Sequence, residues 1–549
     1  MRRAGVLAGL LLAAMAAVGQ SRAPGNDTIR KEDLSADLHF LASDEMRGRL
    51  TDTPEYSLAA SWIEARFKRL GLKGVGEENS FTHRYSLTWS TLGKENRLTL
   101  LSGAVRTQVQ VLDDFMPLFF SPSSQSRGRV MFSGYGIQAP DLRWDDLRGD
   151  VRGAIVLVLE GEPGADDPKS IFDGSVNSVH SDTLRKALNA QARGAVGLLV
   201  VSGRASRSGV NRFGADARGY WPPQPPHLKR YALTTWASKL RIPVASVSQA
   251  LAQQMLGSRT LADLVREAEK PGGFAAITLP DVELDLALAV DRHVIEDRSV
   301  VALLEGSDPQ LKSEAVLVGA HYDHNGTDGS QIYAGADDNG SGTVALIEIA
   351  EAFTQAAAAG QRPKRSVLFV SWGSEERCCG PLLGAWAWAD NPPWPLEKTV
   401  AMLNMDMIGR SEEVPEGGGG RFRGLAVQTG ASNANAVNLI GTSFSPDMRA
   451  AVTAANRNFD LQLRFRYDNN PSNLLRRSDH WVFLNHGVPA LWFHTGLHPD
   501  YHTIYDRPET IDYPKMERIA RLVHQLSWDL AQGGQRPAIL KPRPIPNPD

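Results

Sequence analysis

The stretch EAVLVGAHYDHNGTDGSQIYAGADDNGSGTVALIEIAEAFTQA, residues 314–356, decides the fold. It opens with an apolar run typical of a buried strand, passes through a loop rich in Gly and Asp, and ends in a helical pattern over residues 342–356. A second apolar run, RSVLFVSWGSEE at 365–376, follows closely. A strand, a helix and a further strand in this order predict a parallel sheet with crossover helices.

More strands of the same kind follow along the chain. The runs TVAMLNMDMIG (399–409), GLAVQTG (424–430) and VPALWFHTG (488–496) are nearly continuous apolar segments. Strands of parallel sheets read in this way because helices cover both faces. The sequence therefore predicts an α/β fold built on a doubly wound, mostly parallel sheet.

Five potential metal ligands lie at the ends of these elements. They are His321, Asp338, Glu376, Asp406 and His502. Four follow predicted strands, and Asp338 stands at the start of the predicted helix. Open α/β sheets bind their ligands beyond the carboxyl ends of the strands, so we expect these side chains to meet there. Imidazoles and carboxylates suit zinc, and a bridging carboxylate would allow two ions in one site.

Other polar residues stand beside these ligands. Glu375 directly precedes Glu376, and adjacent side chains diverge, so one can bind metal while the other acts as a general base. Asp323, two residues after His321, is placed to orient the imidazole ring. On chemistry alone, His494 and His498 compete with His502 for the ligand role.

Length and composition bound the class of protein. A chain of 549 residues is too long for one ordinary core, so we expect two or more domains. With 42% hydrophobic and 22% charged residues, it has the composition of a soluble globular protein. The net charge is −3 and both signs are interspersed, which argues against a basic face for nucleic acid or acidic lipid.

The N-terminus has the pattern of an export signal. Arg2 and Arg3 precede the apolar run VLAGLLLAAMAAV (6–18), which is too short to span a bilayer. We expect a signal peptide over residues 1–19, with cleavage after Ala23 as the alternative, and a secreted or periplasmic protein without stable membrane insertion. An uncleaved anchor helix is the competing interpretation.

The sequence pattern changes within the first half of the chain. Short strand patterns separated by glycines predict a smaller α/β module inserted at residues 119–276, for example RGRVMFSGYGI (127–137) and RGAIVLVLEG (152–161). The main domain would then consist of residues 30–118 and 277–533. The Pro-rich segment 534–549 favours a disordered tail.

The only two cysteines are adjacent, Cys378 and Cys379. Such a pair can close only a strained ring, so free thiols and a vicinal disulfide both stay open. An exported protein of this size with no other cysteine does not rely on a disulfide framework.

The motifs in their order closely resemble those of the M28 family of co-catalytic zinc peptidases. They are LASDEMRGRL (41–50), GAHYDH (319–324), GADDNGSG (335–342), SEE (374–376), NMDMIGR (404–410), SDHW (478–481) and DYHTIYD (500–506). The resemblance implies a main domain of the zinc-exopeptidase type and two zinc ions per chain. The inserted module, with FSGYGI (132–137), resembles a protease-associated domain.

The resemblance also implies individual roles. His321 and Asp406 would bind one zinc, Glu376 and His502 the other, Asp338 rather than Asp337 would bridge them, and Glu375 would be the general base. His480 is expected to be structural. Some members carry a tyrosine just before the SDH motif that stabilises the transition state, but residues 474–477 here are Leu-Leu-Arg-Arg. Tyr467 and Tyr501 are the candidates left for that donor.

The expected function is that of an exported di-zinc exopeptidase, an aminopeptidase that removes N-terminal residues from peptides with a metal-activated water and Glu375 as base. A carboxypeptidase of the glutamate-releasing type, or a dipeptidase, would use the same metal core. A glutaminyl-cyclase-like acyltransferase or a non-catalytic receptor-like ectodomain are further alternatives, although the ligand set is complete. We also expect the inserted module to border the mouth of the zinc cleft.

Overall fold

The computed structural model describes residues 21–540, except residues 166, 168, 173, 204–211 and 377–381. The expected signal peptide (1–19), the Cys378–Cys379 pair and residues 541–549 lie outside the described residues. In the part that is described, no helix is both long and apolar enough to cross a membrane.

A nine-stranded sheet organises one half of the molecule, which we call the main lobe. Its strand order is β10-β1-β13-β17-β14-β18-β21-β19-β20. The central strands β17 (Ser366–Trp372), β14 (Ala315–His321), β18 (Thr399–Met405) and β21 (Ala490–His494) are parallel to one another. The flanking β1 (Thr82–Leu92), β13 (Val290–Leu304) and β19 (Ala436–Ile440) join through antiparallel pairings. The predicted α/β class is confirmed, with the parallel part at the centre of the sheet.

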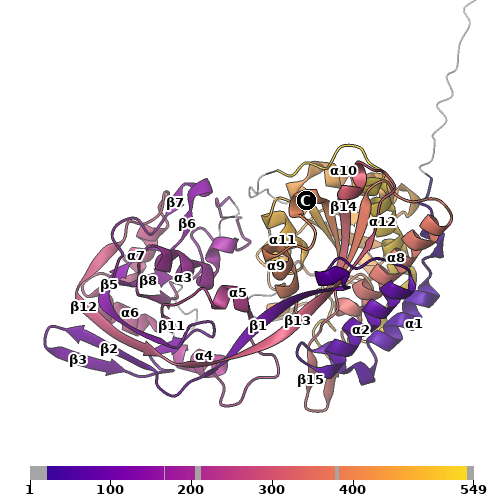
Figure 1. Cartoon of the computed structure of the whole chain (residues 1–549). Coiled ribbons are helices and arrows are strands. Elements are labelled where there is room, and N and C mark those ends of the chain that lie inside the picture. Colours follow the sequence, from indigo (N-terminus) through magenta and orange to yellow (C-terminus); the bar gives the residue numbers. More distant parts are fainter. Residues whose placement is uncertain are drawn as a thin grey trace, which may run out of the picture.

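Helices cover both faces of this sheet (Figure 1). One face packs against α1 (Lys31–Leu41), α2 (Pro54–Arg69), α8 (Gly342–Ala358), α10 (Pro446–Ala455) and α12 (Tyr513–Ala531). The other face packs against α9 (Leu383–Asp390) and α11 (His480–Asn485). Because side chains alternate along a strand, neighbouring residues such as Leu317 and Val318 enter opposite cores.

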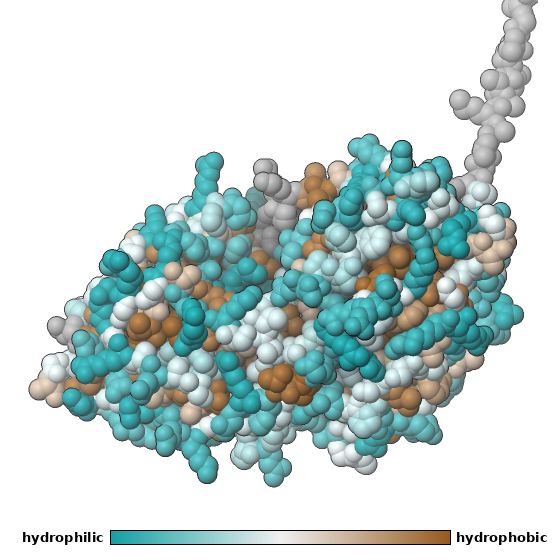
Figure 2. All heavy atoms as spheres, in the orientation of Figure 1, coloured by the Kyte–Doolittle hydropathy of each residue, from teal (hydrophilic) through white to brown (hydrophobic). Residues whose placement is uncertain are grey.

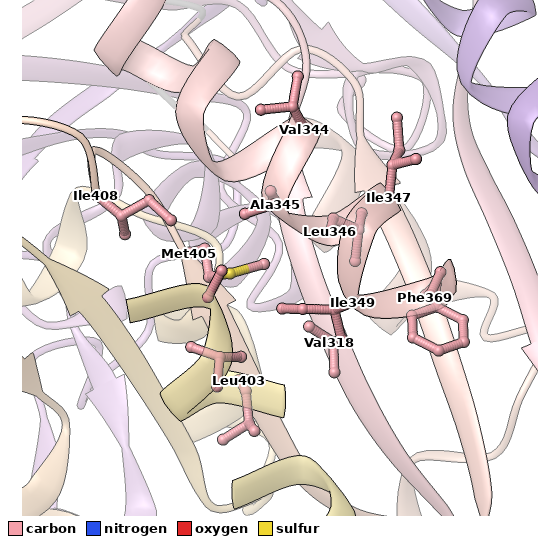
Figure 3. Packing of buried hydrophobic residues seen from close by; sticks show 14 of the residues in the cluster. Val318, Val344, Ala345, Leu346, Ile347, Ile349, Phe369, Leu403, Met405 and Ile408 are labelled. Atoms are coloured by element: carbon pink, nitrogen blue, oxygen red, sulfur yellow. The ribbon is translucent and has the colours of Figure 1, made fainter. Parts of the chain in front are cut away.

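The core beneath the predicted ligands is formed by α8 and the central strands (Figure 3). Ile347 and Ile349 of α8 lie with Val318 of β14, Phe369 of β17 and Leu403 of β18, and all five side chains are fully buried. The helix α8 therefore fixes the position of the loop directly before it, and this loop carries Asp338.

A second sheet forms the other half, which we call the insert lobe (residues 97–288). Its order is β3-β2-β12-β5-β8-β9-β11-β4. The strands are β2 (Arg97–Ser102), β3 (Val105–Val109), β4 (Phe115–Pro117), β5 (Ser124–Phe132), β8 (Ile155–Leu159), β9 (Gly197–Val201), β11 (Val244–Val247) and β12 (Ile277–Leu288). It has its own hydrophobic clusters, which include residues of α3 (Thr183–Ala192), α6 (Gln249–Leu256) and α7 (Leu261–Ala268). The sheet takes in strands on both sides of residues 119–276.

Two long paired strands connect the lobes. β1 and β13 are antiparallel from Thr82↔Val300 to Leu92↔Val290 and run between the two halves of the molecule (Figure 1). The short β10 (Ala232–Leu233) of the insert lobe pairs with β1 at the edge of the main sheet. The outer surface is mostly hydrophilic on the face seen in Figure 2, where hydrophobic residues form only small scattered groups.

Two segments differ from the sequence-based expectation. The apolar run GLAVQTG (424–430) is a loop that makes one isolated bridge, Val414↔Gln428, and Val427 is 66% exposed. The strand of this region is β19 instead, whose residues are all buried. Part of the Pro-rich C-terminal segment is ordered, since Ala538 N–H donates to Asp447 and Leu540 N–H to the carbonyl of Phe444.

Phe353 of α8 offers a test of this packing. Its ring is fully buried and lies 4.7 Å from that of His524 and 5.5 Å from that of Trp528, centroid to centroid. We expect Phe353→Ala to lower the free energy of unfolding by about 3–5 kcal/mol, measured by urea denaturation. The control Phe40→Ala removes a ring that is 41% exposed and should change it by less than about 1 kcal/mol. Equal losses would contradict the assigned core.

Candidate metal centre

The central strands place the predicted ligands at one edge of the main sheet. His321 is the last residue of β14, and Asp406 directly follows β18. Glu375 and Glu376 stand just beyond the end of β17 at Trp372. Asp338 lies in the turn before α8, and His502 lies in the loop after β21. These are the carboxyl ends of parallel strands, where the sequence predicted the cluster.

Around His321, three carboxylates face one imidazole nitrogen. His321 Nε2 lies 3.5 Å from Asp338 Oδ1, 3.6 Å from Asp406 Oδ1 and 3.8 Å from Glu375 Oε2. One ligand atom each from His321, Glu375 and Asp406 lies within 4.8 Å of the other two. All four side chains are buried.

A second group shares Asp338 with the first. His502 Nε2 lies 2.9 Å from Asp338 Oδ2 and 3.2 Å from Glu376 Oε2. The two oxygens of Asp338 thus face two different histidines, which is the arrangement that a bridging carboxylate requires. The structure brings together all five predicted ligands and Glu375.

His324 is a member of the second group that the sequence reasoning missed. Its Nδ1 lies 2.7 Å from Glu376 Oε1 and 3.9 Å from Asp338 Oδ2. Ligand atoms of His324, Asp338 and Glu376 lie within 4.8 Å of one another, and His502 contacts the same two carboxylates. The HYDH sequence carried the signal, since His324 directly follows Asp323.

Asp323 organises the site in a different way from the one expected. The nearer partner of His321 Nδ1 is the backbone carbonyl oxygen of Asp323, at 3.2 Å, while the carboxylate lies 3.6 Å away. The carboxylate instead accepts the backbone N–H groups of Glu375, at 2.9 Å, and Glu376, at 3.1 Å. It thereby fixes the turn from which these two side chains diverge.

Asp337, His494 and His498, the alternatives to the predicted metal ligands, have partners of their own. Asp337 accepts the N–H of Gly409 at 2.7 Å, and its other oxygen lies 3.3 Å from His498 Nε2. His494 Nδ1 lies 3.1 Å from the carbonyl oxygen of Asp406. Burial lowers the pKa of His480 to about 3, so this ring, 5.3 Å from that of Trp492, stays neutral, as its expected structural role requires.

Buried hydroxyl groups hold the acidic residues in place. Ser478 Oγ donates to Asp406 Oδ2 at 2.5 Å and accepts from Asn404 Nδ2 at 2.6 Å. Behind the Glu375–Glu376 turn, Ser374 Oγ donates to Asp297 Oδ2 at 2.5 Å. Both carboxylate-bearing segments are thus tied to the main sheet by hydrogen bonds between residues that lie far apart in the sequence.

The electrostatics of the cluster show that it needs positive charge. Burial opposes charge on His321, but the carboxylates of Glu375 and Asp406 outweigh burial and raise the pKa of His321 well above its usual value. For His502, burial is likewise outweighed, chiefly by Glu376 and Asp338, and the pKa rises to about 10. Four buried carboxylates therefore draw protons onto the neighbouring imidazoles. Divalent cations would satisfy the same demand, and the mixture of imidazole and carboxylate donors fits zinc.

The cluster opens into a cavity of about 680 Å³ between the two lobes, which we call the site cavity. Glu375, Glu376 and His502 line one side of it. The insert lobe supplies the facing wall through Val179, Asp182, Leu184, Arg185, Leu188, Asn189, Trp236 and Lys239. The expectation that the insert borders the mouth of the cleft is confirmed.

A much smaller space of about 20 Å³, the inner pocket, lies among the carboxylates themselves. Asp338, Glu375, Glu376, Asp406, Met407, Leu474, Arg477, Trp492, His494, Leu497 and Tyr501 line it. Of the two tyrosines considered as donors, Tyr501 therefore reaches the site. Tyr467 does not line either space, and its hydroxyl donates to Glu412 at 2.7 Å.

Comparison with known proteins identifies the part of the chain that carries this cluster. Residues 299–527 match the family model described as "Peptidase family M28". These residues are an M28 peptidase domain. They include β14, β17, β18 and β21 with all five predicted ligands, and the resemblance seen in the motifs is confirmed.

The relatives that match this chain include proteins named glutamate carboxypeptidase and proteins named aminopeptidase. A protein named probable glutamate carboxypeptidase from Arabidopsis thaliana is 23% identical over 404 residues, which cover 70% of this chain and 51% of the relative. A Pseudomonas aeruginosa protein named aminopeptidase is 34% identical over 140 residues, 25% of this chain and 23% of the relative. The chain thus spans about half the length of the first relative. A solved aminopeptidase from Aneurinibacillus sp. strain AM-1 has a TM-score of 0.49 and 16% identity, covering 93% of this chain and 96% of that one.

The shared position of Asp338 leads to a test of metal binding. We expect Asp338→Asn to lower zinc content at both positions, because the variant removes the charge that faces both histidines. Asp337→Asn keeps an acceptor for the N–H of Gly409 and should bind zinc normally. Metal analysis of the purified, folded variants measures this. Normal zinc content in Asp338→Asn would remove the bridge from this assignment.

Proposed function

We propose that the chain is a zinc-dependent exopeptidase, and specifically an aminopeptidase that acts on short peptides. The observation that carries the proposal is the pair of histidine–carboxylate groups that share Asp338, with Glu375 beside them on the wall of the site cavity. We further propose that residues 1–19 direct export and that the insert lobe is a protease-associated domain.

The proposed ligand sets are His321 and Asp406 for one zinc, Glu376 and His502 for the other, and Asp338 for both. When bound, the zinc ions would supply Lewis-acid chemistry and neutralise the buried carboxylates. The distances of 2.9–3.6 Å from Asp338 and Asp406 to the imidazole nitrogens support this grouping. His324 would support Glu376 through the contact at 2.7 Å.

Glu375 is the proposed general base. Burial raises the pKa of its carboxyl group well above its usual value, with further increases from Asp406 and Glu376 against the lowering effect of His321. A carboxylate of raised pKa can accept the proton of the attacking water and deliver it to the departing amine. The new C–O bond forms to the carbonyl carbon, the C–N bond breaks, and the amine leaves protonated.

The shape of the site and one of the relatives support cleavage at the N-terminal end of a peptide. The insert lobe walls the site cavity, which favours short peptides or free chain ends over folded proteins. The relative named aminopeptidase has the higher identity, although over a shorter stretch.

A glutamate-releasing carboxypeptidase is the second candidate, because the relative that covers most of this chain carries that name. The two activities separate on substrates. We expect release of p-nitroaniline from aminoacyl-p-nitroanilides and none from their N-acetylated forms. Cleavage of N-blocked peptides that end in glutamate, with aminoacyl anilides left intact, would establish the carboxypeptidase instead.

Metal content separates the remaining alternatives. A di-zinc peptidase should hold close to two zinc ions per chain. One ion per chain would favour the cyclase-like acyltransferase, and none would favour a non-catalytic binding protein.

Glu375→Gln tests the base. We expect kcat to fall by about 10²–10⁴-fold, since the amide cannot accept the proton, while zinc content stays unchanged. The neighbouring Glu376→Gln is the matched comparison and should lose zinc from one position. The reverse pattern, with zinc lost from Glu375→Gln and retained in Glu376→Gln, would exchange the two assignments.

A further inference from the structure

Arg477 occupies a position shared by the two spaces of the site. Four side chains line both the site cavity and the inner pocket: Glu375, Glu376, Arg477 and Tyr501. A substrate that extends from the site cavity into the inner pocket would pass all four of these residues. Arg477 is the one of these four with a permanent positive charge.

The backbone and side chain of Arg477 are both held. Its Nη2 donates to the carbonyl oxygen of Ser472 at 2.6 Å. The next residue, Ser478, donates to Asp406 Oδ2 at 2.5 Å. The backbone N–H of Arg477 donates to the carbonyl oxygen of Leu474 at 2.9 Å. The main chain and the guanidinium group are therefore both held, next to a residue that is bonded to a proposed zinc ligand, and such preorganisation favours charge stabilisation.

Apart from bound zinc, the side chains around the inner pocket offer few other groups that could stabilise negative charge. Among the described residues that line it, four are carboxylates and three, Met407, Leu474 and Leu497, are apolar. Trp492 Nε1 donates to the carbonyl oxygen of Asp406 at 2.9 Å, and His494 Nδ1 lies 3.1 Å from the same oxygen. Arg477 and Tyr501 remain as donors able to reach a substrate.

Hydrolysis creates the need for such a donor. As water adds to the carbonyl carbon, the C=O bond electrons move onto oxygen, and a fixed cation beside that oxygen lowers the barrier. We propose that the Arg477 guanidinium binds the scissile carbonyl oxygen and stabilises the negative charge that it gains. This assignment rests on the proposed peptidase function.

Arg477→Met and Arg477→Lys test the assignment with an aminoacyl-p-nitroanilide. We expect Arg477→Met to lower kcat by about 10²–10³-fold with little change in KM, and Arg477→Lys to lose less, because it keeps the charge. Added guanidinium should restore part of kcat in Arg477→Gly but not in Glu375→Gln. A merely structural role would not produce this rescue.

Two controls accompany these variants. Arg464 is also a half-buried arginine that donates to a backbone carbonyl, that of Ser432 at 3.2 Å, and it lines neither space. Arg464→Met should therefore keep kcat within about threefold of the unaltered protein. Tyr501→Phe measures how much the hydroxyl group of Tyr501, the other possible donor, contributes to kcat.

A binding measurement provides a readout independent of turnover. A phosphonate dipeptide analogue carries a tetrahedral anion where the substrate carries its carbonyl. We expect Arg477→Met to weaken its binding by calorimetry by about 10²-fold, while the affinity for the free amino acid product stays similar. Unchanged kcat and unchanged phosphonate affinity would overturn the assignment, as would a rise in KM alone or a loss confined to Tyr501→Phe. If the unaltered protein neither cleaves the anilide nor binds the phosphonate, the proposed function itself fails, and this assignment with it.

Discussion

The concentration of negative charge around Asp338 is the constraint on which the rest of the site depends. Asp338, Glu375 and Asp406 are buried and the side chain of Glu376 is only 6% exposed, and carboxylates in such surroundings are costly unless cations meet them. The imidazoles of His321, His324 and His502 lie directly against them. The same buried negative charge that destabilises the folded protein attracts divalent cations to the site.

Hydrogen bonds and apolar packing offset the cost of holding these carboxylates together. Backbone N–H groups from the turn after β17 converge on Asp323, and the N–H groups of Asp337 and Asp338 donate to Asp506 at 2.9 and 3.1 Å. The carboxylates of Asp323 and Asp506 thus hold the main chain of Glu375, Glu376 and Asp338, whose side chains form the metal centre. Below them, the apolar packing of α8 on the central strands prevents the loops from relaxing apart (Figure 3). The site is therefore rigid where charge must be held and open only toward the insert lobe.

The sequence allowed the central part of this arrangement to be predicted, because four of the five ligands follow an apolar run whose end is visible in the chain and Asp338 precedes a clear helical pattern. Local patterns do not report what covers a segment, so the apolar run at 424–430 suggested a strand although Val427 is exposed. His324 and Arg477 escaped notice for a related reason. Their roles depend on which distant residues fold against them, as His324 against Glu376 and Arg477 beside Tyr501 in the inner pocket.

The pairing of β1 with β13 has a consequence for how this molecule is put together. Leu92 and Val290, which bound almost two hundred residues of intervening chain, are direct partners in one antiparallel ladder. A domain whose entry and exit points are neighbours can be spliced into a host without rerouting the host chain. To the main sheet, the whole insert lobe is topologically equivalent to the tip of a hairpin. Lengthening, exchanging or shortening that tip would reshape the access to the metal centre while leaving the strands that build it in their places.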